Sequence, residues 1–375
     1  MRIFIYLGHP AHFHLYKNVI ANLIGKRHEV TILIKKKDVL ETLLQESGLP
    51  YHNILAEGRK DSKIGMLCGI LKRAWKLWRF CNKYNPDLLT GTSVENSFVG
   101  KLKGIPVINV GEDDAGAVPL YAKIAYPWAS TILAPAVCDC GKWNHKAVKY
   151  NSYQELAYLH PNHFTPCKEI VKKYFSPDKP YFILRFVKLS ANHDKGIKGL
   201  NTRVAEKIIQ MLRPYGDVYI TSERELEPQF EPYRIAIRPI DMLDVMAFAQ
   251  IYIGDSQTMA AEAGVLGVPF IRFNDFVGRI GYLSELEQVY RLGYGIKSDE
   301  EDKLYATLTD LLNMQDRKNI FLHRKNKMLA EKIDYAQFLT WFLENYPKSK
   351  RIMRTDPSFQ YKFRTDIKHL RENTI

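Results

Sequence analysis

The residues with the clearest potential for chemistry are Ser256 and Glu262, which follow a short apolar run at residues 251–254. The sequence after Ser256 predicts a helix that ends at Gly267, and serine is a good N-cap for such a helix. The N–H groups of its first turn, with the positive end of the helix dipole, favour an anion such as a phosphate. Glu262 lies further along the helix, where its carboxylate could accept hydrogen bonds from a ribose diol. The alternative is an ordinary strand–turn–helix unit in which Ser256 only caps the helix.

A second set of candidates is a group of three histidines, His9, His12 and His14, that follows an apolar strand expected at residues 2–7. A helix is expected at residues 15–25, which would leave the histidines in a loop at the carboxyl end of a strand. Doubly wound folds bind their ligands at such ends. Imidazole is well suited to accept a proton near neutral pH, so His12 and His14 are candidate bases. For each histidine taken singly, a capping or packing role is the alternative.

Three successive acids, Glu112, Asp113 and Asp114, directly follow another strand, expected at residues 105–110. Glu112 and Asp114 are candidates for a general base or for groups that hold substrate hydroxyls. A hydrated turn is the alternative for such a cluster. No further ligands occur at a suitable spacing, so we predict no metal site.

Basic residues mark the carboxyl end of a strand expected at residues 181–187. Arg185 could make a bidentate contact to a phosphate or carboxylate, or could form an internal salt bridge. His193 lies in the basic, glycine-containing loop after this strand, where a diphosphate could be clamped. Residues 235–249 are expected to form a strand, a loop and an amphipathic helix.

Composition and charge limit the class of protein. The chain has 375 residues, of which 46% are hydrophobic and 25% charged, and this is long enough for two domains. There is no apolar stretch of about 18 residues and no signal-peptide pattern, so neither a membrane span nor export is expected. The five cysteines are expected to be free thiols in a reducing cytosol. The net charge of +13 favours acidic partners such as nucleotide sugars or anionic lipid headgroups, and no nucleic-acid-binding module is present.

Two segments are basic enough to raise the question of a membrane. Residues 64–84 are expected to form an amphipathic helix with several Lys and Arg around Trp75 and Trp78. It is either a helix on a membrane surface or a core-facing helix with a solvated basic face. The tail from Pro347 is either an extension that crosses between lobes or a basic arm towards a membrane.

The alternation of strands and helices predicts an α/β protein with two doubly wound lobes and ligands beyond the carboxyl ends of the strands. The expected domains are residues 1–165, 166–346 and a basic C-terminal extension at 347–375. Residues 150–164, which show little periodicity, are expected to form the hinge.

The loop that contains Ser256 resembles the nucleotide-sugar loop of UDP-N-acetylglucosamine 2-epimerases and, more loosely, that of the murein glycosyltransferase MurG. The matching residues are 255–256, 262–263 and 266–269. The resemblance implies that Ser256 and the following amides, those of Gln257 and Thr258, hold a diphosphate and that Glu262 binds the ribose. This chain departs from the epimerase pattern, because Gln257 and Thr258 replace a Gly-Gly pair and Ala261 replaces the first of two glutamates.

Further motifs resemble a bacterial and archaeal family named domain of unknown function 354. They lie at residues 10–14, 126–127, 153–161, 181–186 and 193–199, and the resemblance covers roughly residues 1–340. It implies two Rossmann-like lobes that face each other across a cleft, as in GT-B glycosyltransferases, with a last helix that crosses back to the first lobe. On this topology the backbone around Arg238 would recognise the base, and Asn274 would face the sugar.

These observations predict a metal-independent glycosyltransferase that uses a nucleotide-diphosphate sugar as substrate, with no cofactor, in surface polysaccharide or glycolipid synthesis. The alternatives are a UDP-sugar 2-epimerase and a non-catalytic nucleotide-sugar binding protein. The expected partners are a nucleotide sugar and a glycan or lipid-linked acceptor, and the expected location is the cytoplasm, with the inner face of the cell membrane as a further candidate. The candidate catalytic residues are His12, His14, Glu112 and Asp114. The candidate nucleotide-sugar-binding residues are Arg185, His193, Arg238, Ser256, Gln257, Thr258, Glu262 and Asn274.

Overall fold

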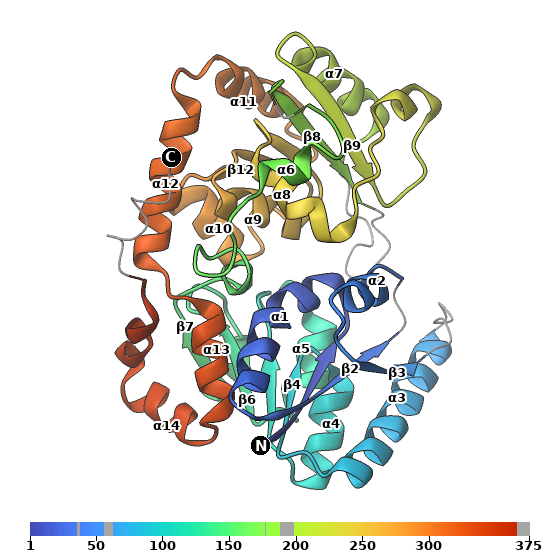
Figure 1. Ribbon diagram of the computed structural model, residues 1–375, viewed down its shortest axis with the longest axis vertical. Coiled ribbons are helices and arrows are strands. Elements are labelled where there is room, and N and C mark those ends of the chain that lie inside the picture. Colours follow the sequence, from blue (N-terminus) through green and yellow to red (C-terminus); the bar gives the residue numbers. More distant parts are fainter. Residues whose placement is uncertain (36–37, 56–62, 177, 188–198, 366–375) are drawn as a thin grey trace. The chain divides into compact units, whose positions relative to one another are not determined.

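The computed structural model describes residues 1–35, 38–55, 63–176, 178–187 and 199–365, and the chain forms two compact units (Figure 1). The first unit contains Met1–His163 and Lys332–Ile375, and the second contains Phe164–Glu331. The first crossing between units is thus close to the expected boundary at residue 165. The second crossing comes earlier than expected, so residues 332–346 belong to the first unit.

The first unit is built on a parallel sheet of seven strands in the order β3-β2-β1-β4-β5-β6-β7. The strands are β1 (Arg2–Leu7), β2 (Glu29–Lys35), β3 (Tyr51–Leu55), β4 (Leu88–Gly91), β5 (Val107–Val110), β6 (Thr131–Pro135) and β7 (Ala147–Tyr150). The chain runs outward from β1 in one direction and from β4 in the other. The loops after these two strands therefore run in opposite directions, and doubly wound sheets bind their ligands at such a point of the carboxyl edge.

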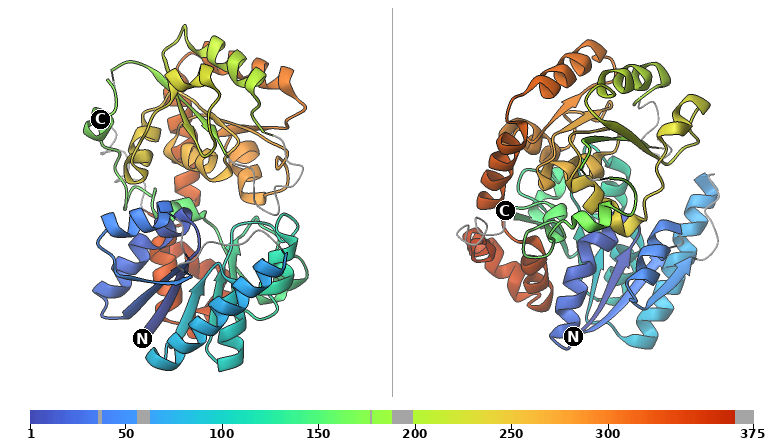
Figure 2. Two further views of the ribbon diagram at one scale, coloured as in Figure 1. Left: turned by 90° about the vertical axis from the view of Figure 1, so that its right-hand side faces the viewer. Right: turned by 45° about the horizontal axis from the view of Figure 1, so that its top comes forward.

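Helices cover both faces of this sheet (Figure 2). One layer is formed by α1 (Pro10–Gly25), α2 (Asp38–Glu46) and α13 (Tyr335–Glu344), with α1 packed between the other two. The other layer is formed by α3 (Lys63–Tyr84), α4 (Val94–Lys103) and α5 (Pro119–Ala125), with α4 in the middle. Burial from both sides explains why β1 reads as a continuous apolar run from Ile3 to Leu7.

The second unit contains a five-stranded parallel sheet in the order β12-β11-β10-β8-β9. Its strands are β8 (Tyr181–Phe186), β9 (Asp217–Ser222), β10 (Tyr252–Gly254), β11 (Phe270–Phe273) and β12 (Gly293–Ile296). Its helices are α6 (Lys168–Val171), α7 (Thr202–Leu212), α8 (Met242–Ala247), α9 (Gln257–Leu266), α10 (Gly281–Ser284), α11 (Glu301–Asn313) and α12 (Arg317–Glu331). The chain adds strands outward from β8 in one direction and from β10 in the other. We call the place between the two inner strands of each sheet, β1 and β4 or β8 and β10, its reversal point. Both units thus have the doubly wound parallel sheet that the sequence predicts.

The first helix begins earlier than expected. Helix α1 starts at Pro10, so His12 and His14 lie within it and not in a loop. Proline suits the first helical position because it lacks the N–H that would have no intrahelical acceptor. His9 takes the N-cap position, with its Nδ1 accepting a hydrogen bond from the Ala11 N–H at 3.2 Å. Histidine is not among the preferred capping residues, which is why the sequence placed the start at Leu15.

Other segments also differ from the expectation. The expected strand near Ile235 is reduced to an isolated bridge between Ile220 and Arg234. Nearly all of the hinge expected at residues 150–164 is part of the first unit, which extends to His163 and includes the end of β7 and the 3-10 turn η2 (Gln154–Ala157). The tail continues as α14 (Lys348–Thr355) and η6 (Pro357–Phe363). Its Phe359 and Phe363 stack on Trp341 of α13, so this part of the tail folds onto the first unit.

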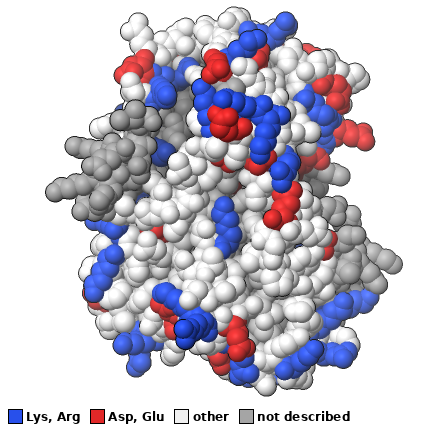
Figure 3. Space-filling model, viewed as in Figure 1, with Lys and Arg blue, Asp and Glu red and all other residues white. Residues whose placement is uncertain are grey.

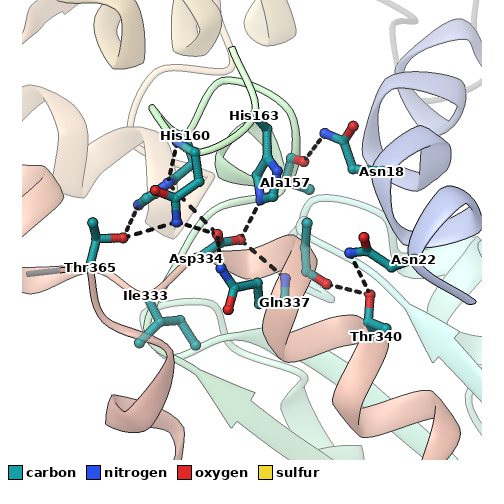
Figure 4. A network of polar contacts seen from close by, with 12 residues as sticks. Asn18, Asn22, Ala157, His160, His163, Ile333, Asp334, Gln337, Thr340 and Thr365 are labelled. Atoms are coloured by element: carbon teal, nitrogen blue, oxygen red, sulfur yellow. Dashed lines mark hydrogen bonds and ion pairs between the residues drawn. The ribbon is translucent and has the colours of Figure 1, made fainter. Parts of the chain in front are cut away.

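Asp334 joins the segments where the chain leaves and re-enters the first unit (Figure 4). It caps α13 by accepting from the Gln337 N–H at 3.1 Å, and it also accepts from His163 Nε2 at 2.8 Å. Asn162 donates to its second oxygen at 2.9 Å. Burial opposes ionisation of Asp334, but the hydrogen bond and charge of His163 and the charge of His160 hold its pKa below the usual value.

Candidate functional site

The N-terminus of α9 has the geometry that the sequence predicts. Ser256 has extended backbone angles, and its Oγ accepts a hydrogen bond from the Met259 N–H at 3.3 Å. The first-turn N–H groups of Gln257 and Thr258 have no acceptor within the helix. Gly267 ends the helix with a φ of +85°, a left-handed conformation that glycine adopts without strain. This helix start follows β10, at the reversal point of the second sheet, where open α/β sheets bind their ligands.

Asp255, next to the cap, fixes the base of the loop that follows β8. Its Oδ1 accepts from the Val187 N–H at 2.8 Å, and its carboxylate also accepts from the backbone of Leu200. Gly199 packs so closely that a Cβ there would lie 2.6 Å from Oδ2. Burial raises the pKa of Asp255 to about 6, against the opposing effect of these backbone hydrogen bonds. Asp255 therefore joins the two sides of the reversal point, and the sequence interpretation missed this role.

Charged groups surround the buried hydroxyl of Tyr252 on β10. Burial raises the pKa of Tyr252 well above its usual value, the positive charge of Arg185 lowers it, and the negative charges of Asp255 and Glu262 raise it. The charges of Arg185, Asp255 and Glu262 therefore all act on the end of this one strand. Glu262 is 6% exposed. Arg185 forms an ion pair with Glu223, the internal alternative named for it above, and this pair holds the guanidinium at the edge of the reversal point.

The other residues predicted for the second unit have different surroundings. Asn274 is fully buried, so it does not face a ligand directly, in contrast to the expectation. Its amide donates to the Asp255 carbonyl at 2.9 Å and its Oδ1 accepts from the Phe276 N–H at 2.9 Å, so it supports the Asp255 turn. The Arg238 guanidinium lies 3.8 Å from Asp241. His193 lies outside the described residues.

In the first unit, His12 lies at the reversal point between β1 and β4. Its Nδ1 accepts a hydrogen bond from the Gly8 N–H at 3.1 Å, which fixes the ring over the turn after β1. The His9 ring is close by, with 6.1 Å between ring centroids. Across the reversal point, Ser93 caps α4 by accepting from the Asn96 N–H at 3.1 Å.

His14 differs from His12 in that it points into the core. Its side chain is packed between Phe13 and Tyr158, with ring centroids 5.3 and 5.2 Å away. Burial, assisted by the charge of Lys17, lowers its pKa to about 3. An imidazole with such a pKa is a weak base at neutral pH, so of the two predicted histidines His12 is better placed for proton transfer.

Glu112 forms a carboxyl pair with Glu155, a residue that the sequence interpretation did not select. Glu112 follows β5, and Glu155 lies on η2 and is 2% exposed. Burial, the negative charge of Glu155 and a hydrogen bond between the two carboxyl groups raise the pKa of Glu112 well above its usual value. Glu112 Oε1 also accepts from the Gln154 N–H at 2.8 Å. The pair therefore retains a proton at a pH at which an isolated glutamate has lost it.

The neighbouring acids point elsewhere. Asp114 Oδ1 accepts from the Asp139 N–H at 2.7 Å, so it anchors a loop, while Asp113 is exposed. The three acids thus do not converge on one point. Within the described residues there is no cluster of three or more His, Cys, Asp and Glu that could hold a metal ion. No helix in the described part of the chain is both long and apolar enough to span a membrane.

Solved structures with the same two-unit fold are glycosyltransferases and sugar-nucleotide epimerases. The S. aureus MnaA–UDP complex matches with a TM-score of 0.65 and 13% identity, over 95% of this chain and 98% of that one. The UDP-GlcNAc 2-epimerase from Neisseria meningitidis bound to UDP-GlcNAc matches at 0.57 and 14%, over 87% and 98%. The spinosyn rhamnosyltransferase SpnG with spinosyn aglycone matches at 0.58 and 14%, over 92% and 100%. At these identities the likeness establishes the fold, which confirms the predicted α/β class.

The comparison with curated protein sequences gave no match. The family model described as "Protein of unknown function (DUF354)" matches residues 1–291, which is well over half of the chain. This match confirms the resemblance noted in the sequence. The chain belongs to the DUF354 family.

Proposed function

We propose that this protein is a glycosyltransferase that takes its sugar from a nucleotide diphosphate. The observation that carries the proposal is the capped N-terminus of α9 at the reversal point of the second sheet, with Arg185 and Glu262 around the same strand end. The N–H groups of Gln257 and Thr258 would bind the diphosphate, and Glu262 would accept hydrogen bonds from the ribose. In the similar structures, the bound nucleotides named are UDP, UDP-GlcNAc and thymidine diphosphate.

Such a site could assist the departure of the diphosphate without a metal ion. As the bond to the sugar breaks, negative charge develops on the leaving phosphate oxygen. Preorganised N–H groups and the helix dipole stabilise that charge because they already point towards it. Arg185 would add a positive charge if the ligand displaced its contact with Glu223. The proposed reaction therefore uses no cofactor.

The first unit would bind the acceptor and supply the base. His12 lies at the carboxyl edge of the first sheet, with its Nδ1 fixed by the Gly8 N–H. That hydrogen bond occupies the lone pair on Nδ1, so the neutral ring carries its proton on Nε2. His12 would therefore act as the base only if its Nδ1 exchanged the Gly8 N–H for the proton of the acceptor. The Glu112–Glu155 pair offers a second route, because a raised pKa makes the ionised carboxylate a stronger base than an ordinary glutamate. We propose a glycan or a lipid-linked sugar as the acceptor, in the synthesis of a surface polysaccharide or glycolipid in the cytoplasm.

One observation favours a second candidate function, a UDP-sugar 2-epimerase. Epimerisation needs acid and base groups beside the sugar carbon, and the raised pKa of the Glu112–Glu155 pair keeps a carboxyl group protonated above the usual pKa of a glutamate. Against it stands Ala261, which occupies the place of the first of two glutamates in the epimerase pattern. The two functions differ in their need for an acceptor. Epimerisation interconverts free nucleotide sugars, whereas transfer releases the nucleotide and requires an acceptor.

The first experiment is a thermal-stability panel with UDP, thymidine diphosphate, other nucleoside diphosphates and their sugars. A ligand that binds only the folded state increases the free energy of unfolding by RT ln(1 + [L]/Kd). The melting temperature therefore rises. We expect one nucleotide to stabilise the wild type and to lose its effect in Glu262→Ala. The matched control is Glu206→Ala, which removes an exposed glutamate of the same unit and should keep the shift. A panel without any shift would contradict both enzymatic functions.

The identified nucleotide sugar is then incubated with the protein in D₂O, with and without acceptors. Release of the nucleotide that depends on an acceptor supports transfer. Deuterium at the sugar C2 without an acceptor supports epimerisation. A protein that binds the nucleotide sugar and does neither with any acceptor of the panel would be a non-catalytic binding protein.

A further inference from the structure

Helices α3, α4 and α5 of the first unit expose large apolar side chains on one surface. Eight of these side chains are each at least 36% exposed, and Trp75 and Leu71 reach 58% and 57%. We call this set the α3–α5 surface, and its members are Leu71, Trp75, Trp78, Phe98, Leu102, Leu120, Ile124 and Trp128. The residues on α3 follow a spacing of four and three, so they form one stripe along the helix. Exposure of so many large apolar groups on adjacent helices marks an interaction surface.

Direct contacts show that the surface is continuous from helix to helix. Lys103 of α4 lies over the ring of Trp78 of α3, 4.2 Å from its centroid. Phe98 of α4 contacts Trp128, just beyond α5, with 5.6 Å between ring centroids. Helix α4 also packs against both α3 and α5. The apolar groups are therefore parts of one surface and not scattered side chains.

The exposed charges on these helices all have one sign. Among the described side chains of α3, α4 and α5 the only acid is Glu95, which is buried and paired with Arg73. The exposed charged residues are all basic, namely Lys72, Arg79, Lys83, Lys101 and Lys123. Where α3 lies in Figure 1, the edge of the space-filling view shows Lys and Arg without Asp or Glu (Figure 3).

The same positive charge continues beyond α4. Burial and the charge of Lys101 lower the pKa of Lys146. Burial and the charges of Arg354 and Lys146 lower the pKa of Lys350 on α14. Both ammonium groups donate to backbone carbonyls of residues 126–130, which places two further positive charges beside Trp128.

We propose that the α3–α5 surface docks the protein on an anionic lipid bilayer. Tryptophan is the residue type that favours the membrane interface, and leucine, isoleucine and phenylalanine can enter the acyl boundary beneath it. The surrounding lysines and arginines are attracted to anionic headgroups. A second copy of this chain is a poorer occupant, because two such surfaces would bring positive charge against positive charge. This inference is independent of the proposed glycosyltransferase activity, since none of the eight apolar side chains belongs to the proposed site.

The test is flotation of the full-length protein with vesicles of phosphatidylcholine alone or mixed with phosphatidylglycerol. We expect binding to the mixed vesicles only, weakened by added salt. Trp75→Ser/Trp78→Ser should lower the partition coefficient about tenfold or more by removing buried apolar area. Lys72→Glu/Arg79→Glu should also lower it about tenfold or more, by removing attraction to the headgroups. Both variants change exposed side chains, so unchanged melting temperatures are expected and serve as the folding check.

Matched controls lie in the second unit. Tyr215→Ser removes a side chain that is 46% exposed, and Lys179→Glu/Arg213→Glu reverses two exposed cations. Both controls should bind vesicles as the wild type does. The proposal is overturned if the wild type fails to float with anionic vesicles, or if the surface variants float as well as the controls. A dimer in sedimentation velocity that the tryptophan double variant abolishes would also overturn it, since a second copy would then cover the surface.

Discussion

At the scale of single residues, the Glu112–Glu155 pair is the most informative group in the first unit. Two carboxyl groups that share a hydrogen bond in a buried setting titrate together, and the raised pKa belongs to the pair. Glu112 could be selected from the sequence because it follows a strand. Glu155 could not, because it lies on a short 3-10 turn in a segment whose buried residues show no helical or strand period.

If this pair is the base for transfer, changing either partner has a distinct effect. Glu112→Gln should lower kcat by about 10²–10⁴. Glu155→Gln should keep activity but shift the acidic limb of the pH profile to lower pH, because the negative charge that raises the Glu112 pKa is gone. The measurement is log(kcat/KM) against pH with the donor and acceptor identified above. An acidic limb that stays in place in Glu155→Gln would show that another group, with His12 as the first candidate, is the base.

His14 gives a residue-scale prediction about stability. Its folded-state pKa is about 3 and its usual value is 6.5, so between these pH values the unfolded chain holds a proton that the folded protein lacks. Stability is therefore lost as the pH falls below 6.5. At pH 5 the loss is about 2 kcal/mol relative to pH 7.5. His14→Phe keeps an aromatic ring beside Tyr158 and should reduce this loss by that amount in urea titrations. His145→Phe, at an exposed position, should leave the pH dependence unchanged.

At the scale of elements, α9 and α1 show what local signals can and cannot predict. Both ends of α9 are preferred types, serine at the N-cap and glycine after the last turn, and the structure has both where the sequence places them. Helix α1 begins with a histidine cap, whose hydrogen bond to the Ala11 N–H is visible only in three dimensions. The role of Asp255 was hidden for the same reason, since its partner Val187 is 68 positions away in the sequence.

Asp255 should stabilise the backbone at Val187 and Leu200, whose N–H groups it accepts from. Asp255→Ala removes the acceptor from two backbone N–H groups, and we expect a loss of about 1–3 kcal/mol in the stability of the second unit. Gly199→Ala should act in the same direction, because its Cβ would lie 2.6 Å from Asp255 Oδ2. Urea denaturation followed by hydrogen exchange at Val187 and Leu200 measures both effects. Asp299→Ala, at an exposed position, is the control and should change neither. Normal protection of these two amides in Asp255→Ala would refute the role.

At the scale of the whole molecule, the alternation of strands and helices was enough to predict two doubly wound units. The order of the strands was not predictable in this way, because the same alternation gives β3-β2-β1-β4 in the first sheet and β11-β10-β8-β9 in the second. The family resemblance implied that the last helix crosses back to the first lobe, but the position of this second crossing was not predictable from the pattern. Residues 332–346 read as one more amphipathic helix, and only their contacts with α1 and with the 160–163 segment assign them to the first unit. Long-range contacts of this kind leave no periodic signal in the sequence.

The Asp334 network predicts how the two units respond to a single substitution. Asp334 is fully buried and accepts from His163, Asn162 and the first turn of α13, so Asp334→Ala leaves several buried donors without their acceptor. We expect a loss of about 3–5 kcal/mol in the first unit, because removing one partner of a buried charged network is strongly destabilising. Hydrogen exchange resolved by peptide should show lost protection in α1 and α13, with α9 and β10 unchanged. Glu344→Ala, at the end of α13, removes the ion pair with Lys26 at the end of α1 and should cost no more than about 1 kcal/mol. Equal loss of protection in both units would show that they unfold as one cooperative body, and that Asp334 stabilises the whole chain rather than the first unit.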